Sequence, residues 1–337
     1  MIPVIFGLAG PTLSAEERAF FSAVEPAGFI LFGRNIVDAA QLRSLTDDLR
    51  ALTGRQALPV LIDQEGGRVA RLKAPHWPAY PCASDFDDLY RQAPASALAA
   101  ARSNGLALAL TLAAVGVNVN CAPMLDIRHA GAHDIVGDRS YGADPVQVAA
   151  LGRAMLDGLE AGGVAGVIKH IPGHGRARCD SHLDLPRVDA SAEQLEQDIA
   201  PFAALAKQAR IAMTAHIVYP TWDPQWPATL SETIISSIVR HRIGFEGLLL
   251  TDDIEMNALA GPVPQRGQAA LTAGCDLVLH CSGELSAMQA LAAALPPIAP
   301  ASLDRLERAL PTPVAEVSPD CLAKAIMHRD ELLALTA

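Results

Sequence analysis

The chain has 337 residues, half of which are hydrophobic, and it carries a formal net charge of −11 at pH 7. A chain of this length fits one α/β barrel with insertions as readily as two smaller domains. The negative charge argues against nucleic acid and anionic membranes as partners, because binding to polyanions requires clustered lysine and arginine. Only 4% of the residues are aromatic, so we expect a soluble protein with a mainly aliphatic core.

Six cysteines occur, none in a C-x-x-C pair, and a chain of this size needs no disulfide bonds for its stability. We therefore expect reduced thiols. The first residues, "MIPVIFGLAG", are apolar but lack the basic residues of a signal peptide. No apolar run approaches the roughly 18 residues of a membrane span. The sequence therefore predicts a cytoplasmic protein that is neither secreted nor inserted in a membrane.

Short apolar runs recur along the chain, and each is followed by polar or glycine-rich residues. The runs are continuous rather than alternating, which is typical of parallel strands buried on both faces. The eight runs begin at Pro3, Gly28, Pro59, Gly116, Gly163, Ile211, Gly247 and Asp276.

Helical patterns separate these runs. Ser14 begins the first, and Glu17 three residues later completes a capping box; Asp38 begins the second. The expected helices cover residues 14–24, 38–52, 95–115, 144–162, 191–209, 231–244, 263–274 and 284–295.

Eight βα units predict a (β/α)8 barrel, with a doubly wound open sheet as the alternative. We expect one catalytic domain over residues 1–337, with the barrel ending near residue 300. The helical patterns in residues 301–337 predict an appended pair of helices that packs on the outside of the barrel.

Polar residues follow most of the predicted strands. Barrel enzymes carry their active sites at the carboxyl ends of the strands, so these side chains are the candidates for function. Their positions predict that they meet at one rim: they are Asp63, Glu65, Asp126, Lys169, His170, His216, Asp252, Asp253 and His280.

The stretch "KHIPGHGRARCDSH" (residues 169–182) suggests a metal site, because His170, His174 and His182 lie close together in the sequence. Asp252 could complete the set of ligands. A barrel metallohydrolase also needs a His-x-His pair after its first strand, whereas this strand ends in "FGLAG". Proline and glycine in "PGHG" exclude the helix that would let His170 and His174 chelate a metal together. We therefore expect no metal.

Four segments carry a resemblance to a known family. They are "IDQEGGRVARL" (residues 62–72), "GDRSY" (137–141), "KHIPGHGRARCDSHLDLP" (169–186) and "TDDIEM" (251–256). In this order they resemble the β-N-acetylglucosaminidases of glycoside hydrolase family 3, specifically the single-domain bacterial enzymes of peptidoglycan recycling. The third segment is highly specific, whereas "TDD" alone is weak.

The resemblance implies a role for particular residues. Asp252 would be the catalytic nucleophile, and His182 the general acid/base with Asp180 as its partner. Two departures, Ile171 in place of an aromatic residue and "RARC" before Asp180, leave these positions unchanged. The terminal N-acetylglucosamine would be bound by Asp63, Arg71, Arg139, Lys169 and His170.

These residue types suit retaining glycoside cleavage. A carboxylate must reach the anomeric carbon while another group protonates the departing oxygen. An aspartate two residues before a histidine can orient the ring, and imidazole titrates near neutral pH. Because glycines flank the loop of His182, we also hypothesise that this loop moves between the two steps.

The resemblance implies that the substrate is N-acetylglucosamine linked to 1,6-anhydro-N-acetylmuramic acid. We also expect a monomer that needs no cofactor. Three alternatives stay open: a phosphorylase with the same nucleophile, a metal-dependent barrel hydrolase, and a sugar-binding barrel without catalysis. The sequence assigns no role to His174, His216, Glu65 or Asp253.

Overall fold

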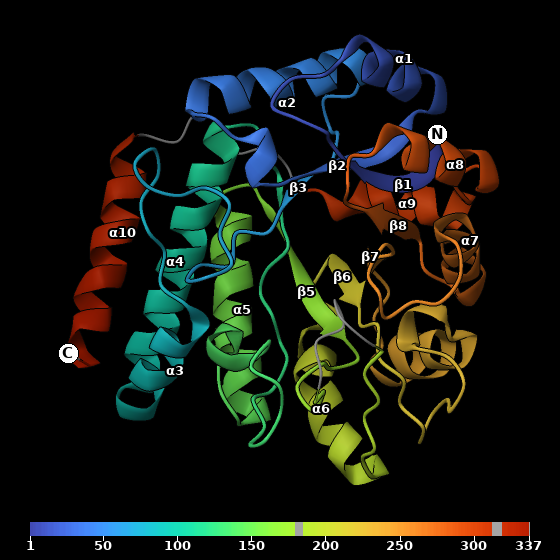
Figure 1. The fold of residues 1–337 in the computed structure, drawn as a ribbon. Coiled ribbons are helices and arrows are strands. Elements are labelled where there is room, and N and C mark those ends of the chain that lie inside the picture. The colour runs from blue at the N-terminus through green and yellow to red at the C-terminus, as the bar shows by residue number, and fades with distance from the viewer. Residues whose placement is uncertain (179–184, 312–318, 337) are drawn as a thin grey trace.

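The structure is a computed structural model and describes residues 1–178, 185–311 and 319–336. Within these residues, eight parallel strands close into a barrel in chain order, and the last strand pairs with the first (Figure 1). The closed barrel confirms the predicted (β/α)8 fold and excludes the open sheet. The strands are β1 (Ile2–Gly7), β2 (Pro26–Leu31), β3 (Val60–Ile62), β4 (Val119–Asn120), β5 (Ala165–Ile171), β6 (Ile211–Thr214), β7 (Leu248–Asp253) and β8 (Leu277–His280).

Helices alternate with the strands much as the sequence predicts. The capping box is confirmed: Ser14 Oγ accepts the Glu17 backbone N–H at 3.1 Å, and Glu17 Oε2 accepts that of Ser14 at 2.9 Å. An additional helix, α3, precedes α4 and was not expected. The helices are α1 (Ala15–Val24), α2 (Ala39–Thr53), α3 (Ala83–Gln92), α4 (Pro94–Ala114), α5 (Pro145–Ala161), α6 (Ala192–Leu205), the π-helical segment Ile234–Arg242, α7 (Val263–Ala273) and α8 (Leu285–Ala294).

Helix α9 (Pro300–Ala309) closes the amino end of the barrel. Its Leu306 and Ala309 belong to the same buried cluster as the inward-facing strand residues. Ser302 and Arg305 of α9 donate to the buried Asp276 carboxylate at 2.7 and 2.8 Å. The expectation that both C-terminal helices pack outside the barrel is therefore wrong for α9, because its apolar face completes the interior.

Helix α10 (Pro319–Leu333) does lie on the outside, along α4 (Figure 1). Its buried Arg329 donates to Asn104 Oδ1 of α4 at 3.1 Å. Among the described helices, α4 is long and apolar enough to cross a membrane by length and composition alone, which corrects the expectation that no such stretch exists. The composition has a local cause, because α4 packs against α3, α5 and α10 and most of the stretch is buried.

Candidate active site

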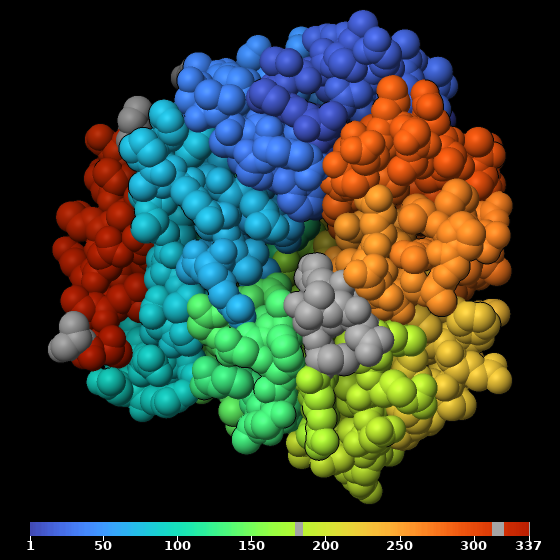
Figure 2. Space-filling view, in the orientation of Figure 1, coloured from blue at the N-terminus to red at the C-terminus, as the bar shows by residue number. Residues whose placement is uncertain are grey.

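A cavity of about 250 Å³ opens at the carboxyl ends of the strands. Figure 2 shows the hollow at the centre of this face, between the blue, green and orange parts of the chain. Six of the predicted site residues line it: Asp63, Arg71, Arg139, Lys169, His170 and Asp252. The predicted Asp180 and His182 lie outside the described residues. The other lining residues are Ile30, Phe32, Val69, Met124, Asp126, Ile135, Val136, His174, Met213, Asp253, Met256, Leu279 and Cys281.

Two consecutive aspartates at the end of β7 both reach this cavity. Neighbours on a regular strand point to opposite faces, but the pairing of β7 with β8 shifts between Leu250 and Asp253. The shift allows both Asp252 and Asp253 to line the cavity. Periodicity alone could not have predicted this arrangement, because it requires the register of the folded barrel.

The environment of Asp252 favours its ionised form. Its Oδ1 accepts the Asp253 backbone N–H at 2.8 Å, and its Oδ2 lies 4.0 Å from His170 Nε2. Burial alone would raise the pKa of Asp252, but the imidazoles of His170 and His216 hold it below its usual value. An ionised carboxylate at a fixed strand end can act as a nucleophile.

The environment of Asp253 instead favours its protonated form. Burial, together with the nearby carboxylates of Glu255 and Asp252, raises the pKa of Asp253 to about 7. Its Oδ1 accepts the backbone N–H groups of Glu255 and Cys281 at 3.1 and 3.3 Å. The neighbouring aspartates therefore differ in charge near neutral pH, because their surroundings differ.

A network of opposite charges holds the basic side chains of the cavity. Lys169 Nζ lies 2.9 Å from Asp63 Oδ1 and 2.7 Å from Glu65 Oε1. Arg139 donates to both Glu65 oxygens, at 2.9 and 2.7 Å, and Arg71 Nη2 lies 3.3 Å from Asp63 Oδ2. Although burial opposes ionisation of both groups, the pairing raises the pKa of Lys169 and lowers that of Glu65. The pairing therefore favours the charged forms of Lys169 and Glu65 and holds all five side chains at defined positions.

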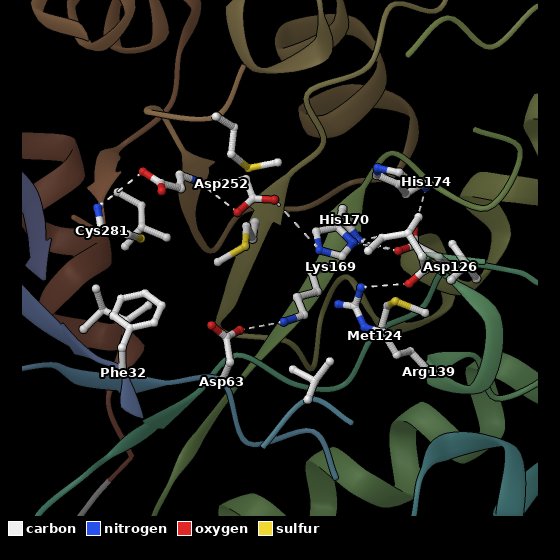
Figure 3. A pocket seen from close by; sticks show the side chains of 18 of the residues that line it. Phe32, Asp63, Met124, Asp126, Arg139, Lys169, His170, His174, Asp252 and Cys281 are labelled. Atoms are coloured by element: carbon white, nitrogen blue, oxygen red, sulfur yellow. Dashed lines mark hydrogen bonds and ion pairs between the residues drawn. The ribbon is translucent and has the colours of Figure 1, made fainter. Parts of the chain in front are cut away.

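Asp126 is a site residue whose role the sequence did not predict. His170 Nδ1 lies 2.7 Å from Asp126 Oδ2, and the backbone N–H groups of His170 and His174 also donate to this carboxylate. Nδ1 therefore carries the proton toward Asp126, and Nε2 faces Asp252 (Figure 3). The sequence signal that pointed to Asp126 was its position after the fourth predicted strand.

The remaining candidates occupy different positions. His174 lines the cavity, and burial lowers its pKa to about 4, so its ring is neutral at neutral pH. Glu65, His216 and His280 do not line the cavity; His216 and His280 are buried, and the Glu65 side chain is 9% exposed. His216 Nε2 contacts the Asp253 carbonyl at 3.0 Å, and His280 Nδ1 lies 3.5 Å from Glu255 Oε2.

The described residues contain no group of three or more His, Cys, Asp or Glu side chains arranged to hold a metal ion. They do contain an ionised carboxylate, a paired imidazole and fixed cations around a cavity at the carboxyl end of a barrel. This arrangement defines a barrel enzyme that binds a small polar substrate.

Comparison with known proteins identifies the kind of enzyme. Residues 5–304 match the N-terminal domain of glycosyl hydrolase family 3. The chain is 40% identical over 318 residues to a β-hexosaminidase from Alkalilimnicola ehrlichii, which covers 93% of this chain and 90% of the relative. The chain therefore belongs to glycosyl hydrolase family 3 and is a glycoside hydrolase, as the sequence resemblance implied.

Solved structures agree with this assignment. NagZ from Neisseria gonorrhoeae in complex with N-trifluoroacetyl-D-glucosamine has a TM-score of 0.88 and 30% sequence identity. The likeness covers 99% of this chain and 98% of that one. The same protein in complex with zinc ion has a TM-score of 0.87 and 29% identity.

Proposed function

We propose that the protein is an exo-acting, retaining β-N-acetylglucosaminidase. The observation that supports it most is the position of Asp252, an ionised carboxylate in a cavity otherwise fitted with groups that bind hydroxyls. A β-hexosaminidase relative and the N-acylglucosamine-type ligand of the Neisseria protein support the choice of sugar. The small size of this cavity suits removal of one terminal sugar rather than cleavage within a chain.

The mechanism has two steps. In the first, an Asp252 oxygen bonds to the anomeric carbon while the bond to the glycosidic oxygen breaks, and His182 gives its proton to that oxygen. In the second, His182 removes a proton from water, the water oxygen bonds to the anomeric carbon, and the Asp252 carboxylate is released. Asp180 orients His182 throughout. The roles of Asp180 and His182 rest on the sequence resemblance.

The sugar would be held by the charged network. Asp63, fixed by Lys169 and Arg71, can accept hydrogen bonds from two adjacent hydroxyls. Arg139 uses Nε and Nη2 on Glu65 and Nη1 on the Ile135 carbonyl, which leaves further N–H groups for the substrate. His170, held by Asp126, is the proposed sugar contact nearest to Asp252.

Hydrolysis is favoured over phosphorolysis by the charge of the cavity. Four carboxyl side chains, Asp63, Asp126, Asp252 and Asp253, are among its described lining residues. The charges of Lys169, Arg71 and Arg139 are already balanced by paired carboxylates, so the remaining carboxylates would repel phosphate. In phosphate buffer we expect free N-acetylglucosamine, whereas N-acetylglucosamine 1-phosphate would identify a phosphorylase.

We further propose that the substrate is N-acetylglucosamine linked to 1,6-anhydro-N-acetylmuramic acid, with or without a stem peptide, degraded in the cytoplasm during peptidoglycan recycling. The resemblance to single-domain enzymes of this kind supports the substrate.

The test uses an aryl N-acetyl-β-glucosaminide and the anhydro disaccharide as substrates. We expect the wild-type enzyme to cleave both and to keep its rate in excess chelator. Loss of the rate in chelator would instead support the metal-dependent hydrolase. Sugar binding without turnover would support the non-catalytic barrel.

A further inference from the structure

We propose that His216 is a positioning residue that orients the Asp252 carboxylate through the backbone of Asp253. The inference rests on the proposed function, in which Asp252 is the nucleophile. His216 does not line the cavity and is 1% exposed, so it acts through another residue rather than on the substrate.

The orientation of the nucleophile depends on its neighbour in the chain. The Asp253 backbone N–H donates to Asp252 Oδ1 at 2.8 Å, while Oδ2 lies on the side of His170. A rotation of the Asp253 backbone would therefore redirect the carboxylate. Such a misplacement lowers the rate of a reaction that needs a defined attack geometry.

Strand pairing holds the backbone of Asp253 on one side only. Asp253 pairs with Leu279 of β8 after a shift in register, but the pairing of β7 with β6 ends at Leu250. His216 Nε2, from the loop after β6, supplies a hydrogen bond here by donating to the Asp253 carbonyl at 3.0 Å. Met256 N–H donates to the same carbonyl at 3.1 Å.

The ring of His216 is itself held in place from behind. Its Nδ1 lies 2.6 Å from Thr229 Oγ1, and this hydroxyl lies 2.8 Å from Thr214 Oγ1 of β6. Because a carbonyl can only accept, Nε2 carries the proton. In the neutral ring Nδ1 then accepts from the Thr229 hydroxyl, which lies 2.6 Å from it and 3.1 Å from the Ala215 carbonyl. Burial lowers the pKa of His216, which favours this neutral form.

The experiment compares His216→Phe with His216→Gln. Phenylalanine keeps the ring shape but removes both hydrogen bonds, whereas the glutamine amide can donate to the Asp253 carbonyl from nearly the same place. We expect His216→Phe to lower kcat about 10- to 100-fold while KM changes less than about twofold. We expect His216→Gln to recover most of the lost kcat.

Thr229→Val provides an independent test, because it frees the ring of His216 without altering it. Its matched control is Thr46→Val, since Thr46 is equally buried and its hydroxyl bonds the Val115 carbonyl far from the cavity. We expect similar losses of thermal stability in the two valine variants, but a kcat more than about fivefold lower only in Thr229→Val.

Three results would overturn the proposal: an unchanged kcat in folded His216→Phe, failure of His216→Gln to recover activity, or equal kcat in Thr229→Val and Thr46→Val. If His216→Phe does not fold, the comparison of the two valine variants decides. Asp252→Asn is measured alongside. Full activity in that variant would refute the proposed nucleophile itself, which is a different outcome from a failure at His216.

Discussion

Within the cavity, residues of one type differ because their neighbours differ. Asp252 has the imidazoles of His170 and His216 nearby, whereas Asp253 has the carboxylates of Asp252 and Glu255. Burial acts on both, but only Asp252 lies beside imidazoles, first that of His170, which favour its ionised form. This division leaves one carboxylate ready for nucleophilic attack beside a second one that titrates near neutral pH.

The first prediction concerns the effect of Asp253 on stability. Its pKa rises from 3.8 to about 7 on folding. Between these values the folded state binds more protons than the unfolded state, so this residue lowers the free energy of unfolding as the pH rises from about 4 to about 7. The Asp253→Asn variant lacks this pH-dependent loss of stability. The difference in melting temperature between the variant and the wild type should therefore shift in favour of the variant from about pH 5 to about pH 8. A difference that stays constant over this range would contradict the assigned pKa.

The second prediction concerns Asp126. Three donors converge on its carboxylate, from the His170 ring and from the backbone of His170 and His174. Asp126→Asn replaces one acceptor oxygen by an amino group, so the His170 ring loses its fixed orientation. We expect kcat/KM to fall about 10- to 100-fold, from the loss of a hydrogen bond to a charged group. The control is His241→Gln, because His241 is exposed. Equal kcat/KM values for Asp126→Asn and His241→Gln would refute the role of Asp126.

The sequence predicted much of the cavity lining but little of its hydrogen bonding. The position of a residue after a strand correctly placed Asp63, Lys169 and Asp252 at one rim, because parallel strands share a carboxyl end. The same criterion could not show that Glu65 lies behind Lys169. Nor could it pair Asp126 with His170, since that contact forms only when the barrel closes.

At the scale of elements, local patterns predicted the helix starts well and the positions of the last helices poorly. The Ser14 capping box forms within one turn, so the local sequence contains all of its partners. The place of α9 depends instead on which apolar surface stays uncovered after eight strands have closed. The interior cluster needs Leu306 and Ala309 to cover its amino end, and no periodicity encodes that.

The third prediction tests the role of α9. Leu306 is 4% exposed within the interior cluster, so Leu306→Ala should lower the free energy of unfolding by about 2–5 kcal/mol. The cavity lies at the opposite end of the barrel, so KM should stay unchanged in the folded variant. Leu335→Ala is the control, because Leu335 is 58% exposed. A similar, small loss in both variants, measured by denaturant unfolding, would contradict the role of α9 in the core.

At the scale of the whole molecule, one closed barrel brings residues from β3, β5 and β7 to a single cavity. The net charge of −11 agrees with a sugar rather than a polyanion as the partner. The large exposed hydrophobic side chains of the described residues occur singly on different elements: Val37, Val146, Trp226, Met327 and Leu335.

The fourth prediction is that the protein is a monomer in solution. Isolated apolar side chains do not form the contiguous patch that a stable subunit interface needs. Sedimentation velocity over a range of micromolar concentrations should give a single species of 35.4 kDa. A concentration-dependent shift toward twice that mass would contradict the prediction.

The most direct test of the account traps the glycosyl intermediate. A His182→Ala variant lacks the base that activates water, so an aryl N-acetyl-β-glucosaminide with a good leaving group should load the enzyme faster than water can clear it. Peptide mass spectrometry of the quenched enzyme should then find one N-acetylglucosaminyl group on Asp252, and none in the double variant that also carries Asp252→Asn. A sugar attached to Asp253 or to another residue, or turnover by Asp252→Asn at the wild-type rate, would contradict the assignment of Asp252 as the nucleophile.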